Sequence, residues 1–166
     1  MHYIVGDTVV HPLYGIGKIV EIEEIIYHDT AARPFYKISV DNAVIWVQMD
    51  DAGEARLRPL TPRHELDLYR KVLTSGPTQL NDDRYKRYSE TNDRLRKPSF
   101  RIWCEVVRDL TARSWDKRLN EYDSSTLRRV MDILSKEWAL SEGISPEEAT
   151  QEIKSILMAA SKNAAV

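Results

Sequence analysis

The stretch "VGDTVVHPLYGIGKIVEIEE", residues 5–24, sets the architecture of the N-terminal part of the chain. Two glycines, Gly15 and Gly17, interrupt apolar, β-branched sequence. A nucleotide-binding loop also contains Gly-x-Gly, but it needs a helix N-terminus directly after the glycines to hold the phosphate. Residues 18–23 instead alternate with the period of a strand, and the third glycine of the nucleotide fingerprint is missing. We therefore expect these glycines to turn or bend a small β-sheet.

The first 60 residues have the pattern of an all-β unit. Apolar residues alternate in 9–10, 19–22, 35–40 and 44–49, and turn signals fall at 11–12, 29–34, 41–42 and 50–53. Four or five short strands in this length predict a small antiparallel barrel or a strongly bent sheet. Gly15 and Gly17 would let its first hairpin fold over sharply, since bulges and positive φ angles are needed for tight closure.

From Thr61 onward the apolar period becomes helical. Thr61 is predicted to cap the first helix, with Pro62 at its first position. Further helices are expected over about 82–96, around Trp103, and around Trp138 up to Gly143. The final helix should open on a capping box in "SPEE", residues 145–148. Strands followed by about five helices predict an α+β chain with two domains, 1–60 and 61–166.

The charge distribution and the cysteine content indicate the kind of partner and the cellular compartment. The 166 residues carry a net charge of −2, but residues 64–135 hold 15 Lys and Arg against 12 Asp and Glu, whereas both flanks are acidic. One face, rather than the whole molecule, is therefore expected to meet an anionic partner. The single cysteine, Cys104, lies in an apolar helical run, which predicts a buried thiol and a reducing compartment. Without a signal peptide or spanning segment, the sequence is expected to be cytoplasmic.

The ionisable residues do not suggest catalysis. The four histidines share no metal-ligand spacing, and one cysteine cannot complete a zinc site. Adjacent carboxylates such as Asp82-Asp83 more often cap a helix or solubilise a turn. We predict a protein that is not an enzyme and that uses no metal and no cofactor.

The segment "RYKRYSETNDRLRKPSFR", residues 84–101, is the most basic part of the chain. On a helix, Arg84, Arg87 and Arg94 would lie roughly along one side and could meet several phosphates. An interleaved tyrosine could stack on a base or wedge into a base step. The alternative is a solvated helix face whose arginines pair with Glu90 and Asp93.

Trp46 is a candidate for protein binding. In "AVIWVQM", residues 43–49, alternation places Ile45 and Val47 on one face and Trp46 and Gln48 on the other. If the first set fills the sheet interior, Trp46 is exposed and is a plausible binding hot spot. The alternative is a tryptophan that packs the sheet against the helical half. Trp103 and Trp138 lie on apolar stripes and should be core residues.

The quoted N-terminal stretch resembles the opening of the CarD/CdnL family of bacterial transcription regulators. The resemblance continues through "ARLRPL", the Tyr-rich basic helix and "EVVRDL", and it covers nearly the whole chain. The N-terminal motif also occurs in the RNA-polymerase-binding module of the repair translocase Mfd, but the helical half fits CarD/CdnL and not the translocase.

The resemblance implies a Tudor-like N-terminal domain that binds the RNA polymerase β subunit and a compact helical domain that binds promoter DNA. Such proteins stabilise the open promoter complex at the upstream edge of the melted region, where a tryptophan wedges into the minor groove. The DNA contacts are expected to be to the backbone and the minor groove, without sequence specificity. A protein-only interaction module, whose basic helix is merely solvated, is the rival interpretation.

The resemblance also identifies where this sequence departs from its family. The wedge tryptophan should fall at Arg84, so either the neighbouring Tyr85 takes its role or Arg84 enters the groove as a charge. The arginines that family members use against the polymerase correspond to Ile25 and Trp46, which implies a more apolar contact. The predicted polymerase-binding residues are Ile25, Tyr27, Trp46 and Gln48. The predicted DNA-binding residues are Arg84, Tyr85, Lys86, Arg87, Arg94, Arg96, Lys97 and Arg101.

Overall fold

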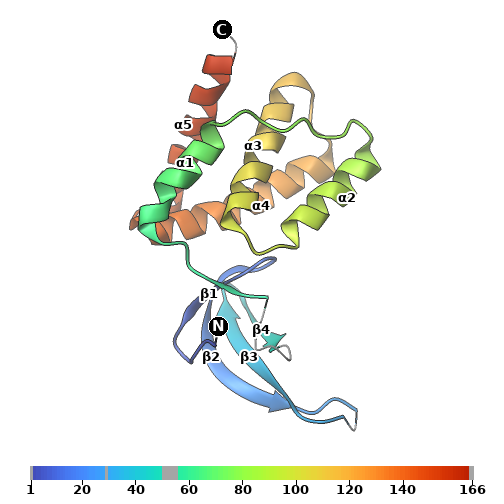
Figure 1. The fold of residues 1–166 in the computed structure, drawn as a ribbon, viewed down its shortest axis with the longest axis vertical. Coiled ribbons are helices and arrows are strands. Elements are labelled where there is room, and N and C mark those ends of the chain that lie inside the picture. The colour runs from blue at the N-terminus through green and yellow to red at the C-terminus, as the bar shows by residue number, and fades with distance from the viewer. Residues whose placement is uncertain (1, 29, 50–55, 165–166) are drawn as a thin grey trace. The chain divides into compact units, whose positions relative to one another are not determined.

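The computed structural model describes residues 2–28, 30–49 and 56–164. The chain divides into two compact units, Met1–Leu60 and Thr61–Val166. The first contains the strands and the second the helices (Figure 1), which confirms the predicted α+β class. The turn expected at 50–53 lies outside the described residues.

The first unit is a five-stranded sheet in the order β4-β3-β2-β1-β5, with every neighbouring pair antiparallel. Its strands are β1 (Thr8–His11), β2 (Gly15–Ile25), β3 (Arg33–Val40), β4 (Ala43–Gln48) and β5 (Arg58–Pro59). The register between β2 and β3 shifts between Ile19 and Glu21, so Val20 is the extra residue of a bulge. Such a bulge increases local twist and bends the strand, and β2 is visibly curved in Figure 1.

The two glycines of the quoted stretch have different roles. Gly15 has a φ of +70°, a conformation that favours glycine, and it begins β2 opposite His11. Gly17 has no positive φ, but a Cβ there would lie 2.5 Å from Cγ2 of Ile38. Gly15 thus serves the sharp turn as expected. The expectation for Gly17 needs correction, because close packing by β3 requires this glycine.

One face of the sheet forms its hydrophobic core. Buried side chains form its centre: Tyr3, Val9, Ile19, Tyr36, Ile38 and Leu57. Partly buried apolar side chains pack against them: Val40, Ile45, Val47 and Met49. Because Ile45 and Val47 point inward, Trp46 points outward and is 48% exposed. The predicted alternation along β4 is therefore confirmed.

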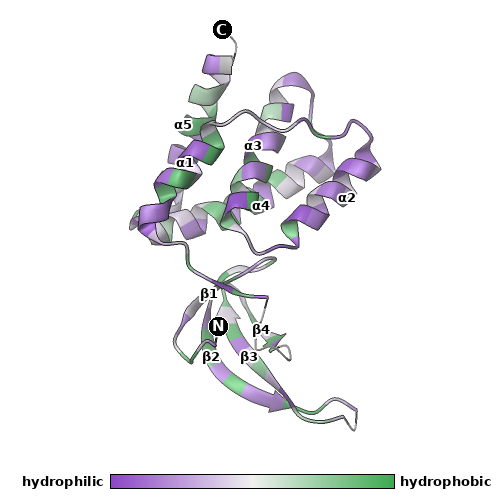
Figure 2. Cartoon of the chain, viewed as in Figure 1, coloured by the Kyte–Doolittle hydropathy of each residue, from purple (hydrophilic) through white to green (hydrophobic). Residues whose placement is uncertain are grey.

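The second unit holds a short 3₁₀ turn and five helices: η1 (Arg63–Glu65), α1 (Leu66–Thr74), α2 (Arg84–Leu95), α3 (Phe100–Asp116), α4 (Glu121–Glu142) and α5 (Pro146–Ala164). Trp103, Cys104 and Trp138 are buried as predicted. In Figure 2, α2 is mostly hydrophilic in colour, and in Figure 1 it lies at the margin of the helical unit. None of the described helices is both long and apolar enough to cross a membrane.

Most predicted helix ends agree with the structure. Gly143 ends α4 with a φ of +82°, and Ser145 and Glu148 form the predicted capping box, with bonds of 2.8 and 3.1 Å. The prediction for Thr61 was wrong. Its N–H and hydroxyl both donate to Oε1 of the buried Glu137, at 2.9 and 2.8 Å, while Pro62 precedes η1. Thr61 therefore ties the start of this unit to α4 and does not cap a helix.

Candidate functional site

The outward side of β2, β3 and β4, which we call the sheet outer face, presents Trp46 beside an ion cluster. Trp46 lies opposite Lys37, which in turn lies opposite Glu21. The Lys37 ammonium donates to Glu21 and Glu23, at 3.0 and 2.9 Å, and lies 5.7 Å from the centre of the Trp46 ring. The Trp46 indole N–H donates to Oε2 of Glu23 at 3.0 Å. These contacts hold the indole in one orientation while it stays exposed.

The same contacts perturb the titration of the cluster. The hydrogen bond from Lys37, followed by the one from Trp46, lowers the pKa of Glu23. The hydrogen bonds to Glu23 and Glu21 raise the pKa of Lys37. Both groups therefore remain charged over a wider pH range than usual. Lys37 and Glu23 are residues that sequence reasoning missed, although the two-residue turn at 41–42 determines that Lys37 lies opposite Trp46.

The other predicted polymerase-binding residues lie on the same face. Gln48 pairs with Phe35, and Ile25 is at the end of β2. The ring of Tyr27, which is 57% exposed, lies 6.1 Å from that of Phe35. Phe35 itself is buried, and it lies next to both Tyr27 and Gln48. The structure thus brings Ile25, Tyr27, Trp46 and Gln48 to one side of the sheet.

The start of α2 presents Arg84 and Tyr85 as a pair. Asp83 caps the helix by accepting the N–H of Lys86 at 2.9 Å. The Arg84 guanidinium lies 4.7 Å from the centre of the Tyr85 ring and donates to its hydroxyl at 2.9 Å. Tyr85 is 66% exposed. The two candidates for the wedge position therefore form one cation-on-ring unit.

Two more tyrosines extend this unit onto α4. The rings of Tyr88 and Tyr122 are tilted against each other with centres 3.8 Å apart, and Tyr85 meets Tyr88 edge-on at 6.4 Å. Asn120 donates to the Tyr88 hydroxyl at 2.7 Å, and Asn92 donates to the Tyr122 hydroxyl at 2.6 Å. We call Tyr85, Tyr88 and Tyr122 the tyrosine cluster. Sequence reasoning missed Tyr122, because nothing local indicates that it meets α2.

Arg87 does not share this surface, which corrects the expectation of a free row of arginines. It is 3% exposed and forms a 2.9 Å ion pair with the equally buried Asp123 of α4. Its guanidinium also donates to the carbonyl oxygens of Asn81 and Asp82, at 2.7 and 3.1 Å. Arg87 therefore anchors α2 to α4 and cannot reach a phosphate without leaving a buried carboxylate unpaired.

Arg94 and Arg101 are also engaged inside the helical unit. Arg94 pairs with Asp109 and Glu105 of α3, at 3.1 and 3.4 Å, and Arg101 pairs with Glu105 at 2.9 Å. Pairing of the arginines within the protein was the alternative interpretation of the sequence. Arg94 and Arg101 are paired in this way, but with carboxylates of α3 and not with Glu90 and Asp93. Arg101 remains 60% exposed, so only Arg94 is held partly inside.

The remaining predicted cations are accessible. Lys86 and Lys97 are exposed and form no ion pair among the residues that the structure describes. Arg96 forms a weak ion pair with Asp93 at 3.5 Å, and its side chain is 77% exposed. Exposed pairs of this kind contribute little and are easily exchanged for a phosphate. Among the predicted DNA-binding cations, Arg84, Lys86 and Lys97 form no ion pair with another described residue, and Arg96 is held only by this exposed pair.

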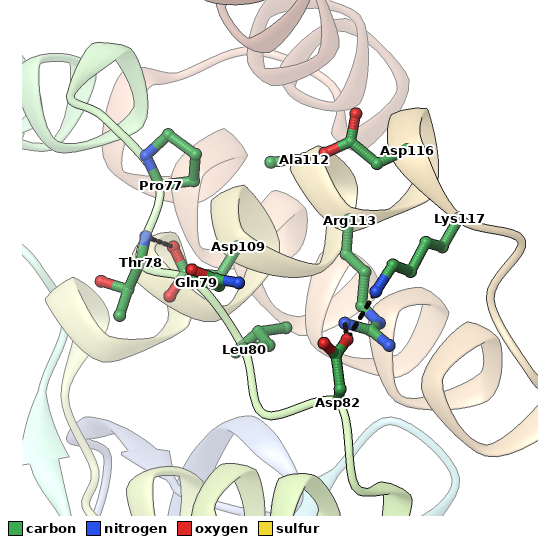
Figure 3. A pocket seen from close by; sticks show the side chains of 10 residues that line it. All are labelled: Pro77, Thr78, Gln79, Leu80, Asp82, Asp109, Ala112, Arg113, Asp116 and Lys117. Atoms are coloured by element: carbon green, nitrogen blue, oxygen red, sulfur yellow. Dashed lines mark hydrogen bonds and ion pairs between the residues drawn. The ribbon is translucent and has the colours of Figure 1, made fainter.

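The segment that precedes α2, residues 77–82, is held against α3 by the contacts drawn in Figure 3, which fixes the position of the start of α2. The N–H of Thr78 donates to Asp109 at 3.0 Å, and Asp82 accepts from Arg113 and Lys117, at 3.3 and 2.6 Å. The hydrogen bond from Lys117 is the main cause of the lowered pKa of Asp82. A pocket of about 220 Å³ with mixed polar and apolar lining remains between this segment and α3. These contacts position the helix that carries Arg84 and Tyr85.

Within residues 2–28, 30–49 and 56–164, no three His, Cys, Asp or Glu side chains could hold a metal ion. Both sets of exposed aromatic and charged side chains described above have instead the composition of binding surfaces.

Comparison with known proteins assigns the family. Residues 3–61 match the CarD-like/TRCF RID domain, and residues 69–154 match the CarD C-terminal domain. The "Putative transcription factor YdeB" of Bacillus subtilis (strain 168) is 23% identical over 145 residues, which cover 87% of this chain and 95% of that protein. The chain therefore belongs to the CarD/CdnL family of transcription regulators and is an RNA-polymerase-interacting factor with a Tudor-like sheet domain and a helical domain.

Proposed function

We propose that this protein bridges the RNA polymerase β subunit and promoter DNA and stabilises the open promoter complex. The proposal rests on one feature that the two matched domains share. In each domain, charged neighbouring side chains hold an exposed aromatic side chain in place. Trp46 is held by Glu23 and Lys37, and Tyr85 is held by Arg84. An exposed aromatic that is already ordered binds with little further loss of side-chain entropy.

The sheet outer face is the proposed polymerase contact. Trp46 would be the central anchor, with Ile25, Tyr27 and Gln48 around it. The Lys37, Glu21 and Glu23 cluster would lie at the polar margin, where charges guide orientation more than they add affinity. Co-elution of the full chain with a purified β-subunit lobe in size-exclusion chromatography tests this contact.

The tyrosine cluster and the exposed cations on α2 and directly after it are the proposed DNA contact. Arg84, Lys86, Arg96 and Lys97 would meet phosphates, while the Arg84–Tyr85 unit would face the minor groove at the upstream edge of the melted region. A side chain that occupies the gap at an unstacked step recovers part of an unstacking cost of a few kcal/mol. Tyrosine covers less area than tryptophan, so this chain should stabilise open complexes less than relatives with tryptophan.

The test is the lifetime of open complexes after a competitor challenge at fixed salt. Tyr85→Ala should shorten the lifetime, and Tyr85→Phe, which keeps the ring, should shorten it less. Arg84→Trp should lengthen it because the larger ring fills more of the gap. If Arg84→Trp folds normally and gives no gain, residue 84 does not lie at the edge of the melted region.

A protein-only docking module is the second candidate, and one observation favours it. Arg87 and Arg94 are paired inside the helical unit, which leaves fewer free cations than the sequence suggests. Footprinting on a promoter complex distinguishes the two candidates. Protection of DNA that depends on Tyr85 supports bridging, whereas co-elution with the β lobe without any protection supports docking alone.

A further inference from the structure

A third surface feature shares no residue with either proposed interface. An open apolar groove of about 530 Å³ runs between α3, α4 and α5. Its apolar lining comes from Leu127, Met131, Leu157 and Met158. Met158 is 54% exposed although it is apolar. This volume and lining are those of sites that bind small molecules, which often lie between the helices of a bundle.

The charges at the groove favour an anionic group. Arg128 and Lys154 both line it, and the Lys154 ammonium forms no ion pair or hydrogen bond within the part of the chain that the structure describes. Arg128 pairs with Glu121, and the two side chains are 72% and 88% exposed. The groove's carboxylate, Asp132, is paired with Lys136 at 3.0 Å. The unneutralised charge at the groove is therefore positive.

A polar atom at the groove also lacks a partner. Thr111 of α3 lines the groove, and its hydroxyl is shielded from solvent and forms no hydrogen bond with another residue that the structure describes. Because this oxygen is out of reach from the open groove, the exposed cations Lys154 and Arg128 indicate where the polar group of a ligand would bind.

We propose that the α3–α4–α5 groove binds a small amphiphile with an alkyl body and one carboxylate, taken up from solution. The alkyl body lies along Leu127, Met131 and Met158, and the carboxylate meets Lys154 and Arg128. The two methionines suit a ligand of this kind, since their flexible thioethers adapt to irregular apolar shapes.

Methionine methyl signals provide a direct readout with an internal control. Met131 and Met158 line the groove, whereas Met49 packs against the core of the sheet unit. Decanoate, kept below its micelle-forming concentration, is titrated into the full chain with ¹³C-labelled methionine methyls. Met131 and Met158 should shift with saturation while Met49 stays in place. Octanoate should bind more weakly, by roughly fourfold for each methylene lost.

Two pairs of variants separate the charge from the apolar surface. Lys154→Gln should weaken decanoate binding by roughly fivefold, and Lys162→Gln, an exposed lysine on α5 outside the groove, should not. Met158→Glu should abolish binding, and Leu140→Glu, an equally exposed apolar residue of α4 outside the groove, should leave it unchanged.

Results of three kinds would overturn the proposal. The first is the absence of saturable shifts at Met131 and Met158 with decanoate. The second is equal binding of decanol, which has no carboxylate, or equal weakening by both lysine variants. The third is that an acidic amphipathic peptide shifts these methyls while decanoate does not, which would make the groove a protein-docking site.

Discussion

Arg87 and Asp123 form a 2.9 Å ion pair in which each side chain is only 4% exposed, although Arg87 belongs to the most basic segment of the chain. The pair joins α2 to the start of α4. Next to it, Tyr88 of α2 packs against Tyr122 of α4. The most basic helix, α2, is thus attached to α4 through Arg87, and this attachment holds the exposed Tyr85 at the surface.

Arg87→Ala should therefore act on stability. Removing one partner of a buried pair leaves the other charge uncompensated, and the free energy of unfolding of the helical unit should fall by about 3–5 kcal/mol. Urea denaturation followed by circular dichroism measures this. Arg84→Ala, an exposed arginine on the same helix, is the matched control and should change stability by about 0.5 kcal/mol or less. Equal effects of the two variants would contradict the anchoring role of Arg87.

Trp46→Ala should weaken binding to a β-subunit lobe by about 2 kcal/mol or more, as central aromatic anchors do. The fold should survive because the indole points away from the sheet core. Calorimetric titration of the full chain with the purified lobe measures the loss. Val44→Ala, a 44% exposed residue on the same face and strand, serves as control and should have a small effect. Unchanged affinity of Trp46→Ala would place the polymerase contact elsewhere.

The Trp46 indole N–H should report the protonation of Glu23. Because the pKa of Glu23 is lowered in the folded protein, its contribution to stability is present above the carboxyl group's ordinary pKa. That contribution is lost as pH falls through the lowered value. The indole resonance should therefore titrate with a midpoint below the ordinary glutamate range. Lys37→Met should move this midpoint upward, since the Lys37 hydrogen bond is the largest cause of the shift. A midpoint that Lys37→Met leaves in place would contradict the cluster geometry.

Lys97→Ala should weaken DNA binding to all sequences alike, if Lys97 meets a phosphate. Each lost phosphate contact should also reduce the slope of log affinity against log salt by about one unit. The measurement is fluorescence anisotropy with labelled duplexes over a range of salt concentrations. Lys162→Ala, on α5, should leave the slope unchanged. If both variants have the same slope as the parent chain, the end of α2 faces away from DNA.

Much of the fold follows from signals that span only a few residues. The sequence predicts the strand period, the positive φ of Gly15 and the outward position of Trp46. It also predicts that α4 ends at Gly143 and that α5 begins after Ser145. Each depends on backbone conformation or on the alternation of neighbouring side chains, which local sequence records. The polymerase-binding role of Ile25 is a prediction that comes from the resemblance of the N-terminal stretch to the family.

The roles of several side chains depend on partners that local sequence does not record. Arg87 has the same charge whether it faces solvent or Asp123, which is 36 residues away. Thr61 has the character of a helix cap, yet it bonds Glu137, 76 residues away, because a buried carboxylate needs donors. Tyr122 joins the tyrosine cluster only because α4 begins beside α2. Periodicity establishes which face of a helix is apolar, but the packing of helices against one another selects which charges are paired and which remain free to bind.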